Sequence, residues 1–168
     1  ALGELDLPFT RECVGGSFGG NRDADFLAMN PNGLVPVIQD GDVTMFESNA
    51  IVRYLCAAHH PGLLRPLGRQ ALAVAEQWME WQQQSFAQHV GVIFWNTVRM
   101  EAELRNAAAV AVAEKAATGA LLIADAHLAR NRWFAGADFS FGDIVMGAAL
   151  WRYMGLDCEK PAVPRISD

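Results

Sequence analysis

The architecture follows from Val35-Pro36-Val37-Ile38-Gln39-Asp40-Gly41-Asp42-Val43-Thr44-Met45-Phe46, a run that continues into Glu47-Ser48-Asn49-Ala50-Ile51-Val52-Arg53-Tyr54-Leu55. Two short β-rich segments flank an Asp-Gly pair, which is a strong hairpin signal because its turn matches the twist of the strands. The second segment leads directly into a helix that opens with polar residues. The run therefore predicts strand, turn, strand and helix.

The start of this predicted helix is a candidate binding site. Ser48 suits the N-cap position, and the first N–H groups of a helix have no intrahelical partner, so they attract a carboxylate. Glu47 is an anion that can pair with an ammonium group beside that carboxylate. A carboxylate next to an ammonium is the α-amino-acid end of a ligand. The alternative is that Glu47 and Ser48 only cap the helix.

Val35 and Pro36 form the second candidate. A proline inside an apolar strand removes a ladder donor and is expected at an edge, a bulge or a special turn. If the bond is cis, Val35 can offer its N–H and C=O to a peptide-like ligand, which then pairs as an added strand. The alternative is an ordinary trans proline in an edge strand.

Two motifs together match a known family. Asn30-Pro31-Asn32-Gly33-Leu34-Val35-Pro36-Val37, followed by Glu47-Ser48-Asn49-Ala50-Ile51, closely resembles the glutathione-binding half of cytosolic glutathione S-transferases, particularly the bacterial theta-like and beta-like ones. The resemblance implies that Val35, beside a cis Pro36, pairs with the cysteinyl part of glutathione. It also implies that Glu47 and Ser48, with Asn49 beside them, bind the γ-glutamyl end.

Composition limits the classes of partner. The chain has 168 residues, 52% hydrophobic and 19% charged, which is typical of a globular protein. The net charge of −6 disfavours nucleic acid and anionic membrane as partners. No apolar run approaches the ~20 residues of a bilayer span, so we expect no membrane-spanning helix. The three cysteines lie far apart and the histidines lack ligand spacing, so we expect no metal site and a reducing cytoplasm.

The rest of the chain divides into an α/β part and a helical part. We expect a strand at Phe9–Val14, a glycine-rich loop at residues 15–20 and a short helix from Asp23 to Met29. The resemblance implies a thioredoxin-like domain with a mixed sheet over residues 1–62, a linker at 63–68 and an all-helical domain at 69–168. Residues 1–5 suit the tail of a helix, so we expect a further strand before Ala1.

In the second part, residues 69–99 predict one long helix, with Gly91 as a possible bend. The alanine-rich segment 101–130 is expected to pack against it, and its predicted apolar side is Leu104, Ala108, Ala111, Leu121, Leu122 and Leu128.

Ser140 and Asp143 predict a capping box at the start of a helix that ends at Gly155, with no helix after it. Candidates for a substrate pocket are Phe94, Trp95 and Arg99.

The resemblance implies a function as well as a fold. It implies an enzyme that conjugates the glutathione thiolate to a small, largely apolar electrophile, as a cytoplasmic, homodimeric detoxification transferase. The residue that activates the thiol is unknown, because no residue here matches the family's activating Ser, Tyr or Cys. Two alternatives are a non-catalytic module of the same fold and a glutathione-dependent thiol reductase. For the reductase role, Cys13 is poorly placed because it is expected on a strand.

Overall fold

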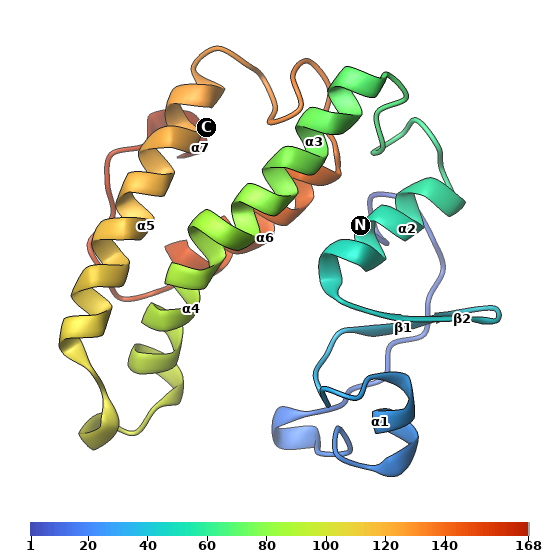
Figure 1. The fold of residues 1–168 in the computed structure, drawn as a ribbon, viewed down its shortest axis with the longest axis horizontal. Helices are drawn as coiled ribbons and strands as arrows, with labels where there is room; N and C mark the ends of the chain where they lie inside the picture. The colour runs from blue at the N-terminus through green and yellow to red at the C-terminus, as the bar shows by residue number, and fades with distance from the viewer. Residues whose placement is uncertain (168) are drawn as a thin grey trace. The chain divides into compact units, whose positions relative to one another are not determined.

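The computed structural model describes residues 1–167, and the chain divides into two compact units, Ala1–Arg65 and Pro66 onward (Figure 1). The division falls inside the segment 63–68, where Pro66 and Gly68 interrupt regular structure. The first unit holds a hairpin with short helices, and the second is all-helical. This matches the fold class expected from the sequence, a thioredoxin-like domain followed by a helical domain.

The first unit is built around one antiparallel hairpin. Strands β1 (Val37–Asp40) and β2 (Val43–Phe46) pair in register, with Asp40 opposite Val43, and Gly41 at φ 58° opens the two-residue turn. Helices α1 (Ala24–Met29) and α2 (Ser48–Ala58) both contact β2. The glycine-rich loop contains a single 3₁₀ turn, η1 (Gly16–Phe18). The hairpin and α1, predicted from residue 23, are confirmed.

The strand predicted at Phe9–Val14 is not formed, so the described sheet is two-stranded and antiparallel rather than mixed. Residues 8–14 run without regular structure and make no backbone–backbone hydrogen bonds within the described chain. A strand is defined by such pairing with a neighbour, and this segment has none. A groove of about 990 Å³ lies between residues 7–12 and residues 35–40.

The predicted helix tail at residues 1–5 is only a hydrogen-bonded turn. The N–H of Leu5 donates to the carbonyl of Ala1 at 2.9 Å, and turns continue to Asp6, which has a φ of 50°. Leu5 is nonetheless buried, so its apolar side chain anchors the N-terminal segment in the core of the unit.

The long helix predicted over residues 69–99 is confirmed, but it is not a regular α-helix throughout. Its successive parts are α3 (Arg69–Trp81), the π-helical η2 (Gln82–Ala87), α4 (Gln88–Phe94) and the π-helical η3 (Trp95–Arg99). The two wider turns flank α4, whereas Gly91, the predicted bend, lies inside regular α-helix.

The second unit packs α5 (Ala107–Leu128) against α4, and α6 (Phe141–Met154) against α3. A short 3₁₀ turn, η4 (Ala102–Leu104), precedes α5. Helix α7 (Pro164–Ser167) contacts α5, so the expectation of no helix after Gly155 is wrong. Pro164 does not prevent this helix, because proline is well tolerated in the first turn. The core of this unit includes Phe86, Val90, Ile93, Ala117, Leu121 and Tyr153.

The predicted apolar side of α5 is largely wrong. Leu104 lies before the helix and is exposed, as is Leu122, and of the predicted set only Leu121 is fully buried. The buried side consists of Ala113, Ala117, Ala120, Leu121 and Ala124. Alanine and aliphatic side chains occupy every side of α5 itself. The spacing of apolar residues in the sequence therefore could not identify which side is buried.

Helix α5 is also long and apolar enough to cross a bilayer, judged by length and composition alone, which the composition had not led us to expect. The same test is passed by core helices of globular domains. In this unit the buried side of α5 belongs to the hydrophobic core with α4 and α6.

The capping box of α6 is confirmed. Ser140 is the N-cap, and its N–H and hydroxyl both donate to Oδ2 of Asp143 at 2.9 Å. The second carboxylate oxygen of Asp143 accepts the N–H of Phe134 at 2.8 Å. Asp143 is buried, so these three donors stabilise its charge and fix the start of α6.

Candidate functional site

The register of the hairpin brings the two sequence-predicted binding motifs to the same end of the sheet. Val37 pairs with Phe46 at the open end of the ladder. Val35 and Pro36 precede Val37, and Glu47 and Ser48 follow Phe46. Since directly opposed residues in an antiparallel pair lie ~5 Å apart at their Cα atoms, the two motifs become neighbours in space.

Val35 presents its backbone for binding. The Val35–Pro36 peptide bond is cis, and Val35 is 58% exposed. Val35 makes no backbone–backbone hydrogen bond within residues 1–167, so its N–H and C=O are available to a ligand. Both Val35 and Pro36 line the groove beside residues 7–12.

A polar turn fixes the approach to Val35. The buried side chain of Asn30 donates from Nδ2 to the carbonyl of Leu34 at 2.7 Å and accepts the N–H of Asn32 at 3.0 Å. Gly33 has a φ of 63°, and a Cβ there would lie 2.8 Å from the carbonyl oxygen of Asn21. Glycine is therefore required at this position, and the turn aims the chain into Val35.

The N-cap of α2 is Glu47, one residue before Ser48, which the sequence predicted as the N-cap. Helix α2 begins at Ser48, and Glu47 is its N-cap, without a hydrogen bond from its side chain to the helix. Glu47 has a φ of 72°, a left-handed conformation that is unfavourable for a residue with a Cβ. Both side chains are exposed, and the Glu47 carboxylate, beside the N-terminus of α2, has no ion-pair partner among residues 1–167.

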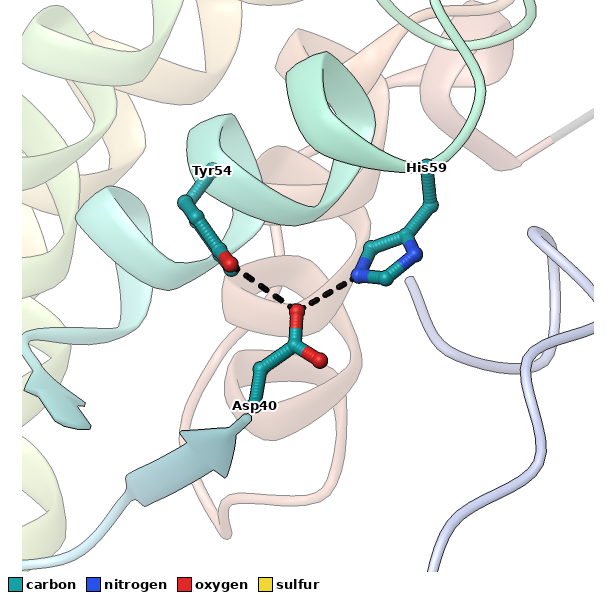
Figure 2. A network of polar contacts seen from close by, with 3 residues as sticks. All are labelled: Asp40, Tyr54 and His59. Atoms are coloured by element: carbon teal, nitrogen blue, oxygen red, sulfur yellow. Dashed lines mark hydrogen bonds and ion pairs between the residues drawn. The ribbon is translucent and has the colours of Figure 1, made fainter. Parts of the chain in front are cut away.

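Figure 2 shows a polar network that sequence reasoning missed, at the other end of β1. Oδ2 of Asp40 accepts the hydroxyl of Tyr54 at 2.9 Å and lies 2.6 Å from Nε2 of His59. The hydrogen bonds from His59 and then Tyr54 hold the pKa of the Asp40 carboxyl below its ordinary value. The network ties β1 to the end of α2. The spacing of the histidines in the sequence does not indicate this contact.

The candidate pocket residues in the second unit are partly brought together. The guanidinium carbon of Arg99 lies 5.4 Å from the ring centroid of Phe94. Arg152 of α6, which the sequence did not point to, lies 5.5 Å from the same centroid. Trp95 is 60% exposed.

The three cysteines lie in different environments. Cys13 is exposed in the extended segment, Cys56 is buried within α2, and Cys158 follows α6; all three are free thiols. Burial raises the pKa of the Cys56 thiol. Residues 1–167 contain no cluster of three or more His, Cys, Asp or Glu side chains placed to hold a metal ion.

Comparison with protein families gives matches over both units. Residues 1–58 match the family model described as glutathione S-transferase, N-terminal domain, and residues 86–168 match the one described as glutathione S-transferase, C-terminal domain. The chain is 41% identical over 152 residues to glutathione S-transferase GstB of Escherichia coli K12, a match that covers 89% of this chain and 73% of GstB.

Solved structures and a more distant relative extend the comparison. The theta class glutathione S-transferase of Xanthomonas axonopodis pv. citri, with glutathione bound, is 37% identical and has a TM-score of 0.93, covering 99% of this chain and 80% of that one. Elongation factor 1-gamma 2 of Oryza sativa subsp. japonica is 35% identical over 139 residues, which are 80% of this chain and 31% of that protein.

Proposed function

The chain belongs to the glutathione S-transferase family of enzymes, and from this premise we propose that it conjugates the glutathione thiolate to a small, largely apolar electrophile. The observation that carries the proposal is the convergence of Val35 and Glu47 at one end of the hairpin, in a chain whose structural neighbour holds glutathione. Together with Pro36 and Ser48, these residues offer groups suited to the γ-glutamyl and cysteinyl parts of the tripeptide.

Two parts of glutathione, the γ-glutamyl end and the cysteinyl residue, have matching groups in the first unit. Glu47 pairs with the ammonium of the γ-glutamyl end, while Ser48 and the first N–H groups of α2 bind its carboxylate. The N–H and C=O of Val35 pair with the cysteinyl residue as an added strand does. Pro36 fixes the backbone beside that residue, and Asn49 lies in the first turn of α2. The cysteinyl thiol is thereby held at the edge of the groove.

The reaction needs the thiol as thiolate, because only the thiolate attacks the electrophilic carbon. None of the residues assigned to glutathione binding supplies an obvious activating group. We propose that binding and orientation of glutathione are the contributions of Val35, Pro36, Glu47, Ser48 and Asn49.

A test of the proposal combines binding with turnover. Titration calorimetry with reduced glutathione is expected to give saturable one-site binding, and 1-chloro-2,4-dinitrobenzene is expected to release chloride only when glutathione is present. Absence of saturable binding at millimolar glutathione would refute the site and the function together.

A second candidate function is a non-catalytic module that keeps the fold for association with other proteins. The similarity to elongation factor 1-gamma 2, which extends over a part of that protein, favours it. Glutathione binding without any turnover would support the module over the transferase. The reductase alternative has less support, since none of the three cysteines lies at the start of a helix, where a thiolate is stabilised.

We also propose that the protein is a cytoplasmic homodimer with a role in detoxification. The three free thiols suit a reducing compartment. Large exposed apolar side chains in the second unit, such as Val112 at 72% and Trp151 at 83%, support association with a second copy. Light scattering coupled to gel filtration is expected to give twice the mass of one chain.

A further inference from the structure

Two arginines converge on one aromatic ring in the second unit. The guanidinium carbon of Arg99, in the last turn of η3, lies 5.4 Å from the centroid of the Phe94 ring. The guanidinium carbon of Arg152, in the last turn of α6, lies 5.5 Å from the same centroid. Both positive charges therefore lie within about 11 Å of each other, and both are within the range of cation–π attraction to Phe94.

The π-helical turn produces this arrangement. Residues five apart in an α-helix point ~140° away from each other, so Arg99 and Phe94 would lie on different sides of a regular helix. In η3 the N–H of Met100 donates to the carbonyl of Trp95 at 2.8 Å, an i to i+5 bond that places residues five apart one above the other. Such wide turns are frequent at functional sites.

Neither guanidinium is neutralised by a residue that the structure describes. Both arginines are exposed, and neither has an ion-pair partner among residues 1–167. Two like charges this close repel each other, and in a chain with a net charge of −6 residues 1–167 nevertheless place no carboxylate in an ion pair with either of them. Attraction to helix C-termini accounts for each arginine separately, but it gives no reason for both to meet at Phe94.

We propose that Arg99 and Arg152 bind the carboxylate of an aromatic electrophile, so that the preferred co-substrates of this protein are aromatic acids. This rests on the proposed transferase function. Planar guanidinium groups match a carboxylate in geometry, and Phe94 together with the exposed ring of Trp95 gives aromatic surface for the substrate ring. Arg99 and Arg152 act here as specificity residues, and the site lies in the second unit alone.

The probe is 4-chloro-3,5-dinitrobenzoate, compared with the neutral 4-chloro-3,5-dinitrobenzamide. In the reaction the glutathione thiolate forms a C–S bond to the ring carbon that carries chlorine, the C–Cl bond breaks, and chloride leaves with the electron pair. The thiol proton passes to the buffer. We expect the KM for the benzoate to be about 10-fold below that for the benzamide, and to rise with added salt while the KM for the benzamide does not.

The variants Arg99→Gln and Arg152→Gln remove each charge and keep part of the side-chain stem. Each is expected to raise the KM for the benzoate about 10-fold, equivalent to about 1.4 kcal/mol, with little change for the benzamide. Arg99→Lys keeps the charge without the planar fork and is expected to recover part of the loss. The control is Arg132→Gln, which removes an exposed arginine over the Trp133 ring, 5.8 Å away, and is expected to leave both KM values unchanged.

Direct binding separates this inference from the function on which it rests. Calorimetric titration of the benzoate without glutathione is expected to show binding that weakens about 10-fold in each variant, whether or not chloride is released. Release of chloride from neither compound refutes the transferase function and leaves the titration to decide the arginine site. Equal benzoate affinity in wild type and in a folded Arg99→Gln/Arg152→Gln double variant overturns the inference.

Discussion

Oδ2 of Asp40 lies 2.6 Å from Nε2 of His59, so the last residue of β1 is joined to the C-cap residue of α2. Tyr54, within α2, donates its hydroxyl to the same oxygen at 2.9 Å. A single carboxylate oxygen thus connects the hairpin to the helix whose N-terminus carries Glu47 and Ser48. The network lies at the far end of β1 and α2 from the proposed glutathione contacts.

The first prediction concerns the pH dependence of this network. The pKa of Asp40 is lowered in the folded protein, chiefly by the hydrogen bond with His59, so its ionised form stabilises the fold. That stabilisation is present above the ordinary carboxylate pKa of about 4 and is lost as the pH falls through the lowered value. Asp40→Asn is therefore expected to lower the free energy of unfolding at pH 7, by an amount that shrinks as the pH approaches 2.

Chemical denaturation at several pH values measures this difference. The control is Asp42→Asn, two residues away in the turn of the same hairpin, where the carboxylate has no ion-pair partner among the described residues. A difference between wild type and Asp40→Asn that stays constant from pH 7 to pH 2 would contradict the assignment.

The second prediction tests the glutathione contacts. Glu47→Ala and Ser48→Ala are each expected to weaken glutathione binding at least 10-fold, because hydrogen bonds to charged groups contribute about 1.5–3 kcal/mol. The exposed Glu4→Ala removes the same charge elsewhere in the first unit and serves as the control. Calorimetric affinities that are unchanged in both site variants would show that the ligand lies elsewhere.

The third prediction concerns the turn that aims the chain into Val35. Gly33→Ala is expected to destabilise the protein by more than about 1–2 kcal/mol, since the added Cβ meets the Asn21 carbonyl at 2.8 Å and φ is 63°. Gly3→Ala is the control, because a Cβ at Gly3 has no atom within 4 Å. Thermal unfolding of the two variants gives the comparison, and equal midpoints would show that the turn tolerates a side chain.

The fourth prediction separates the capping box of α6 from ligand binding. Asp143→Ala leaves three donors without their acceptor in a buried environment, and we expect a loss of at least about 2 kcal/mol in stability. Glutathione affinity of the folded fraction is expected to stay at the wild-type value. The exposed Asp138→Ala is the control. Lost turnover with an unchanged unfolding midpoint would mean that Asp143 takes part in the chemistry.

The fifth prediction uses the two tyrosines of the chain. Burial raises the pKa of Tyr153 to about 12, and the hydrogen bond to Asp40 raises the pKa of Tyr54. Absorbance of phenolate is therefore expected to stay low at pH 10 in the folded protein and to appear on unfolding. Because the raised values favour the protonated form, this stabilisation is present below pH 10 and is lost as the pH rises through the folded values. If half of the tyrosine were ionised at pH 10 in the folded protein, the raised pKa values of Tyr54 and Tyr153 would be contradicted.

Local signals in the sequence were enough to predict most elements. The turn at Gly41, the start of α1 after Asp23, the long helix from Arg69 and the capping box of Ser140 and Asp143 all depend on residues near each other in the chain. The motifs around Val35 and Glu47 are equally local. A binding role could be proposed for them from sequence alone, because backbone geometry and the start of a helix involve only a few neighbouring residues.

Other features depend on which parts of the chain meet in space. Residues 9–14 alternate like a strand, yet a strand also needs a paired neighbour. The buried side of the alanine-rich α5 is chosen by its contacts with α4, and the shared acceptor of Tyr54 and His59 by the closeness of α2 to β1. The meeting of Arg99 with Arg152 at Phe94 joins residues more than fifty positions apart in sequence. Local sequence determined the hairpin, most of the helices and the motifs that we propose for glutathione. Tertiary packing alone decided these long-range contacts, because the free energy that selects them comes from burial and charge between segments that have no local signal in common.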